Sequence, residues 1–567
     1  RILPVRLTIT VLAVLAAPPA SAAEGELEII DAHIHYSEDA WQSMPAGDAV
    51  EAGTVVARVG APPRNGDWPP HLHLQLAVAL PGAGGDPPRP AHDLPGVVDP
   101  RAREGWKAVF PNPAALVGLE PSAVDAEAME AAAGRSRDAL RARRARLLGP
   151  NLSLSYREPL HLVKGWRQFL YDAAGRAYLD LYNNVPHVGH SHSRVVEAVR
   201  AQAALLNTNT RYLHDNVLRY AEALTARMPD GLDVAYFVNS ASEANELALR
   251  LARAATGRRE LLVMEAGYHG HTTTLVQASP YKFAGPGGEG REPWVDVVDL
   301  PDLYRGRYRR EDPDAAARYV ADVEALVAGM AAEGRPPGAF LAESLPSVGG
   351  QIVLPDGYLA GVYRAVRAAG GICIADEVQV GFGRLGEVFW GFELQEVVPD
   401  VVVLGKPMGN GFPLGAVICR GEIAEAFDTG MEFFSTFGGN PMSCAAGLAV
   451  LEVLEQEGLQ AHALEVGRRL TAVLREVAAT HAGVGDVRGM GLFQGVEVVS
   501  DPDARTPWGA GASYLVNRLA ERGILTGTDG PDHNVVKLRG PMVVEAADVD
   551  RLGEVLAEVV SETALRF

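Results

Sequence analysis

Cysteine is scarce in this chain, and its few cysteines are not arranged as a disulfide framework. Among 567 residues there are three: Cys373 and Cys419 fall inside apolar runs, and Cys444 falls in a helical pattern. None has the spacing of a zinc site. Buried, unpaired thiols are typical of a reducing compartment. The part of the chain that contains them is therefore predicted to be cytoplasmic.

Positively charged residues are also relatively few. The 51 lysines and arginines are outnumbered by 71 aspartates and glutamates, which gives a formal net charge of -20. Because nucleic acids and anionic membranes attract basic surfaces, this balance argues against either of them as a partner. Hydrophobic residues make up 47% of the sequence. A chain of this length and composition can bury a large core and form more than one domain.

Residues 1–43 depart from this cytoplasmic pattern. The segment RILPVRLTITVLAVLAAPPASAA combines basic residues, an apolar stretch and a small-residue site, as a secretory leader does, but it is too short for a convincing membrane span. It leaves the location of the whole protein open. The next segment, LEIIDAHIHYSEDAW, resembles the first strand of amidohydrolase barrels. That resemblance implies metal ligation by His33 and His35, but nothing resembling the rest of such a barrel follows.

Residues 44–115 carry a second short resemblance. MPAGDAVEAGTVVARVGAPPRNGDWPPHLHLQL is similar to the closing β-segment of lysostaphin-like zinc endopeptidases, which implies a metal-binding pair at His71 and His73. The half of that domain that supplies the other ligands is missing, and zinc sites need three or four. We interpret this partial β-segment as vestigial, with zinc peptidase activity as a remote alternative. Residues 116–150 are predicted to form a linker helix, acidic early and basic late.

From residue 151 to residue 567, apolar runs alternate with helical patterns. The patterns carry apolar residues at three- and four-residue spacing, and the runs that resemble buried strands begin at residues 234, 260, 338, 372, 401 and 414. This alternation predicts an α/β fold with a large, mainly parallel sheet covered on both faces. The segments after Asn440, together with residues 151–200, are predicted to form a small α+β domain.

Two of the runs end in residues with distinctive chemistry. Lys406 follows VVVLG and opens a glycine-rich turn, and Asp376 follows the apolar residues 372–375. In open parallel sheets the chemistry lies at the carboxyl ends of the strands. Pyridoxal phosphate needs an amine for its Schiff base and a carboxylate that keeps its pyridine nitrogen protonated. Taken singly, a solvated loop lysine and a helix-capping aspartate would explain the two residues about equally well.

Two further segments could hold the same cofactor. In NSASEANELALR, small residues precede a helix, whose first N–H groups and dipole would face a phosphate. Ordinary helix capping is the alternative interpretation. In GYHGH, Tyr268 and His269 offer an aromatic face for a flat ring, although a tyrosine at a strand end more often serves packing.

Taken together, residues 151–567 resemble the class III aminotransferases, a branch of the fold-type I pyridoxal phosphate enzymes. The matching segments occur in the order of the family: YLDLYNNVPHVGHSH, NSASEANELALRLAR, GYHGH, AESLPSVGGQIVLPDGYL, IADEVQVGFGRLG, VVVLGKPMGNGFPLGAV and STFGGNPMSCAAGLAVLE. The resemblance implies pyridoxal 5'-phosphate as cofactor, a small-molecule primary amine as substrate and a homodimer.

The resemblance also assigns roles to residues. Lys406 would form the Schiff base and Asp376 would pair with the ring nitrogen. The cofactor-binding set that it implies consists of Ala241, Ser242, Tyr268, His269, Glu343, Asp376, Gln379, Lys406 and Thr436. Tyr268 would stack on the ring, Gln379 would reach its phenolic oxygen, and Thr436 would reach the phosphate of the neighbouring subunit. Many members have glycine where this chain has Ala241, so a methyl group has to fit beside the phosphate.

Two departures bear on the reaction. Transaminating members often carry an arginine that binds a carboxylate and a glutamate that gates it; here Lys537 and Gly349 stand at the matching positions, with Arg539 two residues further on. A lysine is a point charge that suits a phosphate. The segments NNVPHVGHSH, LNTNTRYLHD, SPYKF and GGQI are similar to the phospho-lyase subgroup, which acts on phosphoethanolamine or phosphohydroxylysine. The sequence therefore favours β-elimination of phosphate and ammonia, with Lys537 and Arg539 binding the substrate.

Two other interpretations of residues 151–567 stay open. The enzyme could be a transaminase that moves an amino group from an ω-amino acid or amine to a keto acid. It could also be an inactive interaction module that keeps the fold, but the presence together of Lys406, Asp376, Tyr268 and Gln379 argues against that.

Overall fold

The computed structural model describes residues 29–32, 76–78 and 136–562, and the chain divides into two units, Arg1–Leu140 and Arg141–Phe567. In the first unit, strands β1 (Ile29–Ala32) and β2 (Leu76–Val78) pair antiparallel. The leader-like segment and most of the partial β-segment lie outside the described residues, as do His33, His35, His71 and His73. The domain boundaries at residues 43, 115 and 150 stay predictions.

The second unit contains a seven-stranded sheet. Its order is β6 (Val234–Val238), β12 (Gly415–Cys419), β11 (Val401–Leu404), β10 (Ile372–Asp376), β9 (Ala339–Glu343), β7 (Leu261–Met264) and β8 (Val295–Val298). Strand β12 runs antiparallel to both neighbours, and the ladders from β11 to β8 are parallel. The predicted α/β fold with a mainly parallel sheet is confirmed. Of the seven strands of this sheet, β8 is the one that the sequence did not predict.

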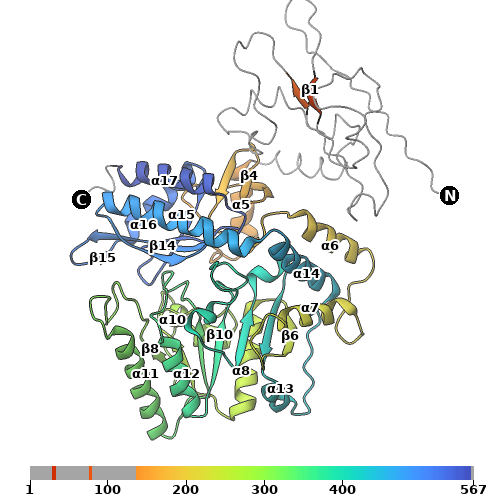
Figure 1. Ribbon diagram of the computed structural model, residues 1–567, viewed down its shortest axis with the longest axis vertical. Helices are drawn as coiled ribbons and strands as arrows, with labels where there is room; N and C mark the ends of the chain where they lie inside the picture. The colour runs from red at the N-terminus through yellow and green to blue at the C-terminus, as the bar shows by residue number, and fades with distance from the viewer. Residues whose placement is uncertain (1–28, 33–75, 79–135, 563–567) are drawn as a thin grey trace, which may run out of the picture. The chain divides into compact units, whose positions relative to one another are not determined.

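Helices cover both faces of this sheet, as expected for strands that are mostly apolar. Against one face, α8 (Ala241–Thr256), α9 (Thr273–Ala278) and α13 (Gly421–Phe427) contribute Leu247, Leu251, Leu275 and Ile423 to a core with Val263, Leu341 and Val403. Against the other, α11 (Ala315–Ala332) and α12 (Tyr358–Ala368) bury Val323, Tyr358 and Val362 on Leu262, Phe340 and Cys373. These two helices lie side by side in Figure 1.

A smaller domain is built from both ends of the second unit. One of its sheets has the order β16 (Ile524–Leu525), β5 (Ala177–Asp180), β4 (Phe169–Asp172), β3 (Leu162–Trp166). The other has the order β13 (Val484–Met490), β14 (Phe493–Asp501), β18 (Val535–Leu538), β17 (Gly527–Asp529), with β15 (Thr506–Pro507) on β14. In Figure 1, β4 lies near α15 (Leu459–Thr480), α16 (Gly509–Glu521) and α17 (Ala546–Val560). Residues before 200 thus complete the small domain, as the sequence predicts.

Helices α6 (Ser193–Ala203), α7 (Asp215–Thr225) and α14 (Pro441–Gln456) lie between the two domains along the chain, with α14 packed on the other two. All three cysteines are buried and unpaired, as predicted. Within the described ranges, no helix has both the length and the apolar character that crossing a membrane requires.

A shortened protein that begins at Asn151 should keep the stability of the second unit. The helix before it, α5 (Arg137–Leu147), has the predicted order of charges but buries none of its residues, so its removal exposes little apolar surface. We expect the thermal unfolding midpoint in calorimetry to stay within about 2 °C, the shift that roughly 1 kcal/mol causes in a large domain. A clearly lower midpoint would show that residues 1–150 contribute to folding.

Candidate active site

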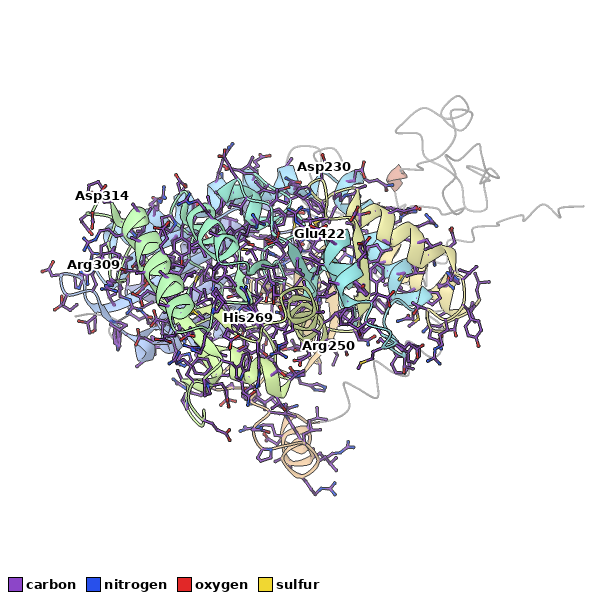
Figure 2. All side chains as sticks on the ribbon, turned by 90° about the horizontal axis from the view of Figure 1, so that it is seen from below. Asp230, Arg250, His269, Arg309, Asp314 and Glu422 are labelled. Atoms are coloured by element: carbon purple, nitrogen blue, oxygen red, sulfur yellow. The ribbon has the colours of Figure 1, made fainter. Side chains whose placement is uncertain are left out.

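A cavity of about 360 Å³ opens where several strands of the large sheet end. Its wall includes most of the residues that the sequence singles out: Ala241, Ser242, Tyr268, His269, Glu343, Asp376, Gln379 and Lys406. Glu343 and Asp376 are the last residues of β9 and β10, and the others come from loops and helix starts that follow β6, β7, β10 and β11. Figure 2 shows His269 among the interior side chains, whereas Arg309 and Asp314 lie at the edge. The structure therefore gathers residues up to 165 positions apart, from Ala241 to Lys406, around one space.

Lys406 stands two residues beyond β11, at the start of the 3₁₀ turn Lys406–Gly409. The turn ends at Asn410, whose φ of 47° is left-handed. The Asn410 side chain accepts from Val188 N at 2.9 Å and donates to Gly189 O at 2.8 Å, which ties the turn to a loop of the small domain. Burial lowers the pKa of Lys406, and the nearby Arg539 lowers it further. This environment favours a neutral amine, the form that acts as a nucleophile or base.

Asp376 ends β10 and is buried. Its Oδ2 accepts from Asn245 Nδ2 at 3.0 Å and lies 2.9 Å from Nδ1 of His269, while Oδ1 accepts from Val378 N at 3.1 Å. Asn245 Nδ2 also donates to the carbonyl of His269 at 2.9 Å. The carboxylate is therefore fixed by three neighbours. Asn245 was not predicted as a site residue, although a polar residue in the helical pattern that begins with NELALR was a signal for it.

The start of α8 forms one end of the cavity. Ser240 caps the helix by accepting from Glu243 N at 3.2 Å, which leaves the N–H groups of Ala241 and Ser242 without intrahelical acceptors. The capping interpretation and the anion-site interpretation are therefore compatible. A Cβ atom at Gly405 would lie 2.8 Å from the Ala241 methyl. The extra methyl is thus accommodated because the residue before Lys406 is glycine.

Tyr268 and Gln379 lie on other parts of the wall. The Tyr268 ring is half-buried and packs edge-to-face on Tyr281, with ring centroids 6.1 Å apart. Gln379 is buried, and its Oε1 accepts from Asn184 Nδ2 at 2.8 Å and from Arg539 Nη1 at 2.6 Å. Neither Asn184 nor this link to Arg539 was predicted.

Glu343 and Asp376 lie side by side, because they are partners in the parallel register of β9 and β10. Glu343 is buried, and its Oε2 accepts from Ser347 N at 3.2 Å. Burial, followed by the Asp376 charge, raises the pKa of Glu343 to about 8. Two buried carboxyl groups this close cannot both ionise easily, so Glu343 is the one that holds a proton at neutral pH.

Lys537 and Arg539 lie at and just beyond the end of β18, and both are buried. Lys537 Nζ donates to Asp529 Oδ1 at 2.8 Å, and Arg539 Nη2 lies 3.6 Å from Asp529 Oδ2. Arg539 also donates to the Ser347 hydroxyl. Arg539 is linked to the cavity wall by its hydrogen bond to Gln379. At Gly349, the expected position of a gating glutamate, a Cβ would face Leu300 and Pro346 rather than this pair.

Two features lie apart from this site. Thr436 is exposed in the loop between α13 and α14 and does not line the cavity. A hollow of about 480 Å³ in the small domain, beside Trp508 and His481, contains none of the residues predicted from the sequence. In the part of the chain that the structure describes, no group of histidine, cysteine or acidic residues is placed to hold a metal ion.

Comparison with known proteins identifies the family. Residues 155–560 match the model of the class III aminotransferases. An alanine–glyoxylate aminotransferase 2-like protein of Drosophila melanogaster is 47% identical over 71% of this chain and 83% of its own length. An ethanolamine-phosphate phospho-lyase homologue of Caenorhabditis elegans is 39% identical over 72% of this chain and 90% of its own. An Arthrobacter phospholyase, solved in complex with phosphoethanolamine, is 42% identical, with a TM-score of 0.71 over 75% of this chain and 99% of its own.

The chain therefore belongs to the class III aminotransferase family and is a pyridoxal phosphate-dependent enzyme of fold-type I. The cavity fits that cofactor, since it joins an amine, a buried carboxylate, an aromatic ring and open helix N–H groups. Within the described residues, Asn245 Oδ1 and His269 Nε2 are buried without hydrogen-bond partners.

Replacing Glu343 by glutamine should change how stability depends on pH in the cofactor-free protein. Since the pKa of Glu343 rises from 4.5 to about 8 on folding, its contribution is present below pH 4.5 and is lost as pH rises through 8. As pH rises from acidic to alkaline, the free energy of unfolding of Glu343→Gln should therefore increase relative to that of the wild type. The increase should be at most about 5 kcal/mol, at roughly 1.4 kcal/mol per pKa unit. Urea unfolding at several pH values would measure this, and parallel curves for the two proteins would refute it.

Proposed function

We propose that the enzyme eliminates phosphate and ammonia from phosphoethanolamine or a similar phosphorylated amine. The observation that carries this proposal is the pair of buried cations, Lys537 and Arg539, which share one carboxylate and adjoin the cavity wall. Cations that are buried with too few anions favour an anionic ligand. A phosphate group supplies more charge and more acceptors than a carboxylate does.

In this proposal the cavity residues would hold pyridoxal phosphate as follows. Asp376, whose carboxylate is fixed by Asn245 and His269, would hold a proton at the ring nitrogen. Tyr268 would cover the ring, and Gln379 would reach its phenolic oxygen. The N–H groups of Ala241 and Ser242 would bind the phosphate, as open helix starts do. When bound, the cofactor supplies an electron sink that stabilises negative charge on the substrate carbon.

Lys406 then acts on the substrate. Its pKa is lowered by burial and by Arg539, so the free amine removes a proton from the carbon that carries the substrate nitrogen. The bond between the neighbouring carbon and the phosphate oxygen breaks, and phosphate leaves with the electron pair, held by Lys537 and Arg539. Water converts the remaining enamine to an aldehyde and ammonia. For phosphoethanolamine, the sum is one water consumed and one acetaldehyde, ammonia and phosphate released, with no keto acid needed.

A transaminase is the second candidate, and Arg539 favours it. A buried guanidinium beside Gln379 could bind a substrate carboxylate through two parallel hydrogen bonds. The names of the relatives include both a phospho-lyase and an aminotransferase, so a product assay has to decide. Zinc peptidase activity is a remote alternative. It rests on the sequence motif of His71 and His73, which lie outside the described residues.

Purified enzyme should release inorganic phosphate from phosphoethanolamine without any keto acid. Lys406→Ala should lower this rate by at least roughly 10³-fold, the scale of general acid–base catalysis. Lys164→Ala, at an exposed lysine on β3, is the matched control and should keep full activity. A colorimetric phosphate assay measures all three proteins. Amino transfer that requires a keto acid and releases no phosphate would establish the transaminase instead.

We also propose that the enzyme is a homodimer. Two neighbouring loops expose apolar side chains, which include Leu205, Tyr212, Leu213, Met431 and Phe437 at 79%, 66%, 100%, 73% and 66% exposure. Arg211 joins the loops, since it pairs with Glu432 at 3.0 Å and its guanidinium carbon lies 3.9 Å from the Phe434 ring centroid. A large apolar patch of this kind is typical of an interaction site. Thr436 lies within it, as a residue that reaches a neighbouring subunit should.

Changing Leu213 to aspartate should therefore produce monomers with weakened cofactor binding. A charge placed in an apolar interface is desolvated without a partner. Sedimentation velocity would measure the assembly, and dialysis followed by absorbance would measure the bound cofactor. Leu162→Asp, at an exposed apolar residue on β3, is the control and should remain dimeric. A Leu213→Asp protein that stays dimeric would place the interface elsewhere.

Two further predictions remain untested. We propose that residues 1–150 are not needed for this chemistry. A cytoplasmic location also stays a prediction, because the names of some relatives place them in mitochondria.

A further inference from the structure

Asp529, which neither the sequence patterns nor the proposed reaction singled out, is the carboxylate that holds the two substrate-side cations. It ends β17 and is buried. Its Oδ1 accepts from Lys537 Nζ at 2.8 Å, and its Oδ2 accepts from Gln351 Nε2 at 2.9 Å and lies 3.6 Å from Arg539 Nη2. Both oxygens therefore contact groups that belong to the candidate substrate site.

The backbone around Asp529 is built to hold this arrangement. In the β17–β18 ladder, Gly527 lies opposite Lys537, and a Cβ at Gly527 would come within 2.4 Å of the Tyr182 ring and 3.0 Å of Lys537 Cε. Glycine thus leaves room for the lysine stem, whose Nζ lies 5.0 Å from the centre of that ring.

The third neighbour, Gln351, is held just as closely. It is fully buried and has a φ of 58°, an uncommon conformation for a residue other than glycine. Its Nε2 donates to the Ser347 carbonyl at 2.8 Å as well as to Asp529. A buried residue in this uncommon conformation, whose amide bridges the Ser347 carbonyl and the Asp529 carboxylate, fixes the position of that carboxylate.

We propose that Asp529 is a positioning residue, which fixes Lys537 in its charged form beside Arg539 so that the pair binds the phosphate group of the substrate. This proposal rests on the proposed phospho-lyase reaction. Burial, with a further contribution from Arg539, lowers the pKa of Lys537 below its ordinary value, and Asp529 is the group that opposes this shift. Removing the charge of Asp529 should make Lys537 lose its proton at lower pH.

Other charged or titratable groups surround Asp529 and Lys537 and have to be separated from them. They are Arg539 beyond β18, Arg384 next to Arg539, Tyr182 after β5, Tyr281 in α10 (Pro280–Phe283) and Lys406 after β11. Replacing Lys537 by arginine isolates its contribution, because a guanidinium loses its proton at higher pH than an ammonium group in the same place.

The test is binding of inorganic phosphate to the cofactor-loaded enzyme, measured by isothermal titration calorimetry from neutral to alkaline pH. Wild-type affinity should fall as pH rises, and in Asp529→Asn the fall should move to lower pH by roughly one unit, as loss of an adjacent opposite charge predicts. With Lys537→Arg, alone or added to Asp529→Asn, the fall should move to higher pH than in the wild type. In steady-state assays with phosphoethanolamine, Asp529→Asn should raise KM roughly tenfold with little change in kcat.

Asp532→Asn is the matched control, because it makes the same charge change in the same turn but removes a contact to Arg305 instead. It should bind phosphate with the wild-type pH dependence. If wild-type enzyme binds and releases phosphate but Asp529→Asn shows the wild-type pH dependence, or if Lys537→Arg leaves the fall in affinity at the wild-type pH, the role of Asp529 is wrong and the proposed function stands. If wild-type enzyme neither binds inorganic phosphate nor releases it from phosphoethanolamine, the proposed function fails, and the role of Asp529 fails with it.

Discussion

The active site depends on the register of one parallel ladder. Strand β10 places Asp376 beside Glu343 of β9 and Val403 of β11, so that Lys406 follows three residues later at the same edge. An amine and two carboxyl groups are thereby forced together out of water. Burial disfavours the charged forms of Glu343 and Lys406, which keeps a proton on Glu343 and moves Lys406 toward its neutral form. A shift of this register would separate the three groups and remove the chemistry.

The substrate side of the site comes from a different part of the chain. Strands β17 and β18 of the small domain carry Asp529, Lys537 and Arg539, and Arg539 meets the large domain through Gln379 and Ser347. The large sheet therefore supplies the residues proposed to hold the cofactor, and the small domain supplies those proposed to select the substrate. With this division, changes in the small domain leave the residues at the sheet edge in place, as expected for a fold that hosts more than one reaction.

The sequence predicted the large sheet and the residues that end its strands, because a buried strand and its last polar residue are local signals. It did not predict partners that depend on tertiary contacts. Asn245 lies 131 positions from Asp376, and Gln351 lies 178 positions from Asp529. Asp529 stands in a polar hairpin, where an aspartate is ordinary turn chemistry. Only the pairing of β17 with β18 shows that it faces Lys537. Residues 1–135 other than the strands β1 and β2 lie outside the described part of the chain, so the predictions for them remain as the sequence left them.

The charge around Arg539 bears on the choice between carboxylate and phosphate. Lys537 and Arg539 share the single negative charge of Asp529, which leaves an excess of one positive charge. Arg384 adds another, since it is fully buried, interacts electrostatically with Arg539 and, among the described residues, has side-chain hydrogen bonds only to His187 and to the carbonyls of Leu492 and Gly540. Burial and the Arg539 charge lower the pKa of Arg384 to about 9, which shows how poorly this charge is compensated. A substrate carboxylate carries one negative charge and would neutralise half of this excess of two positive charges. A phosphate monoester carries nearly two negative charges at neutral pH, so it matches this site, and that match is the physical reason for favouring elimination of phosphate over transamination.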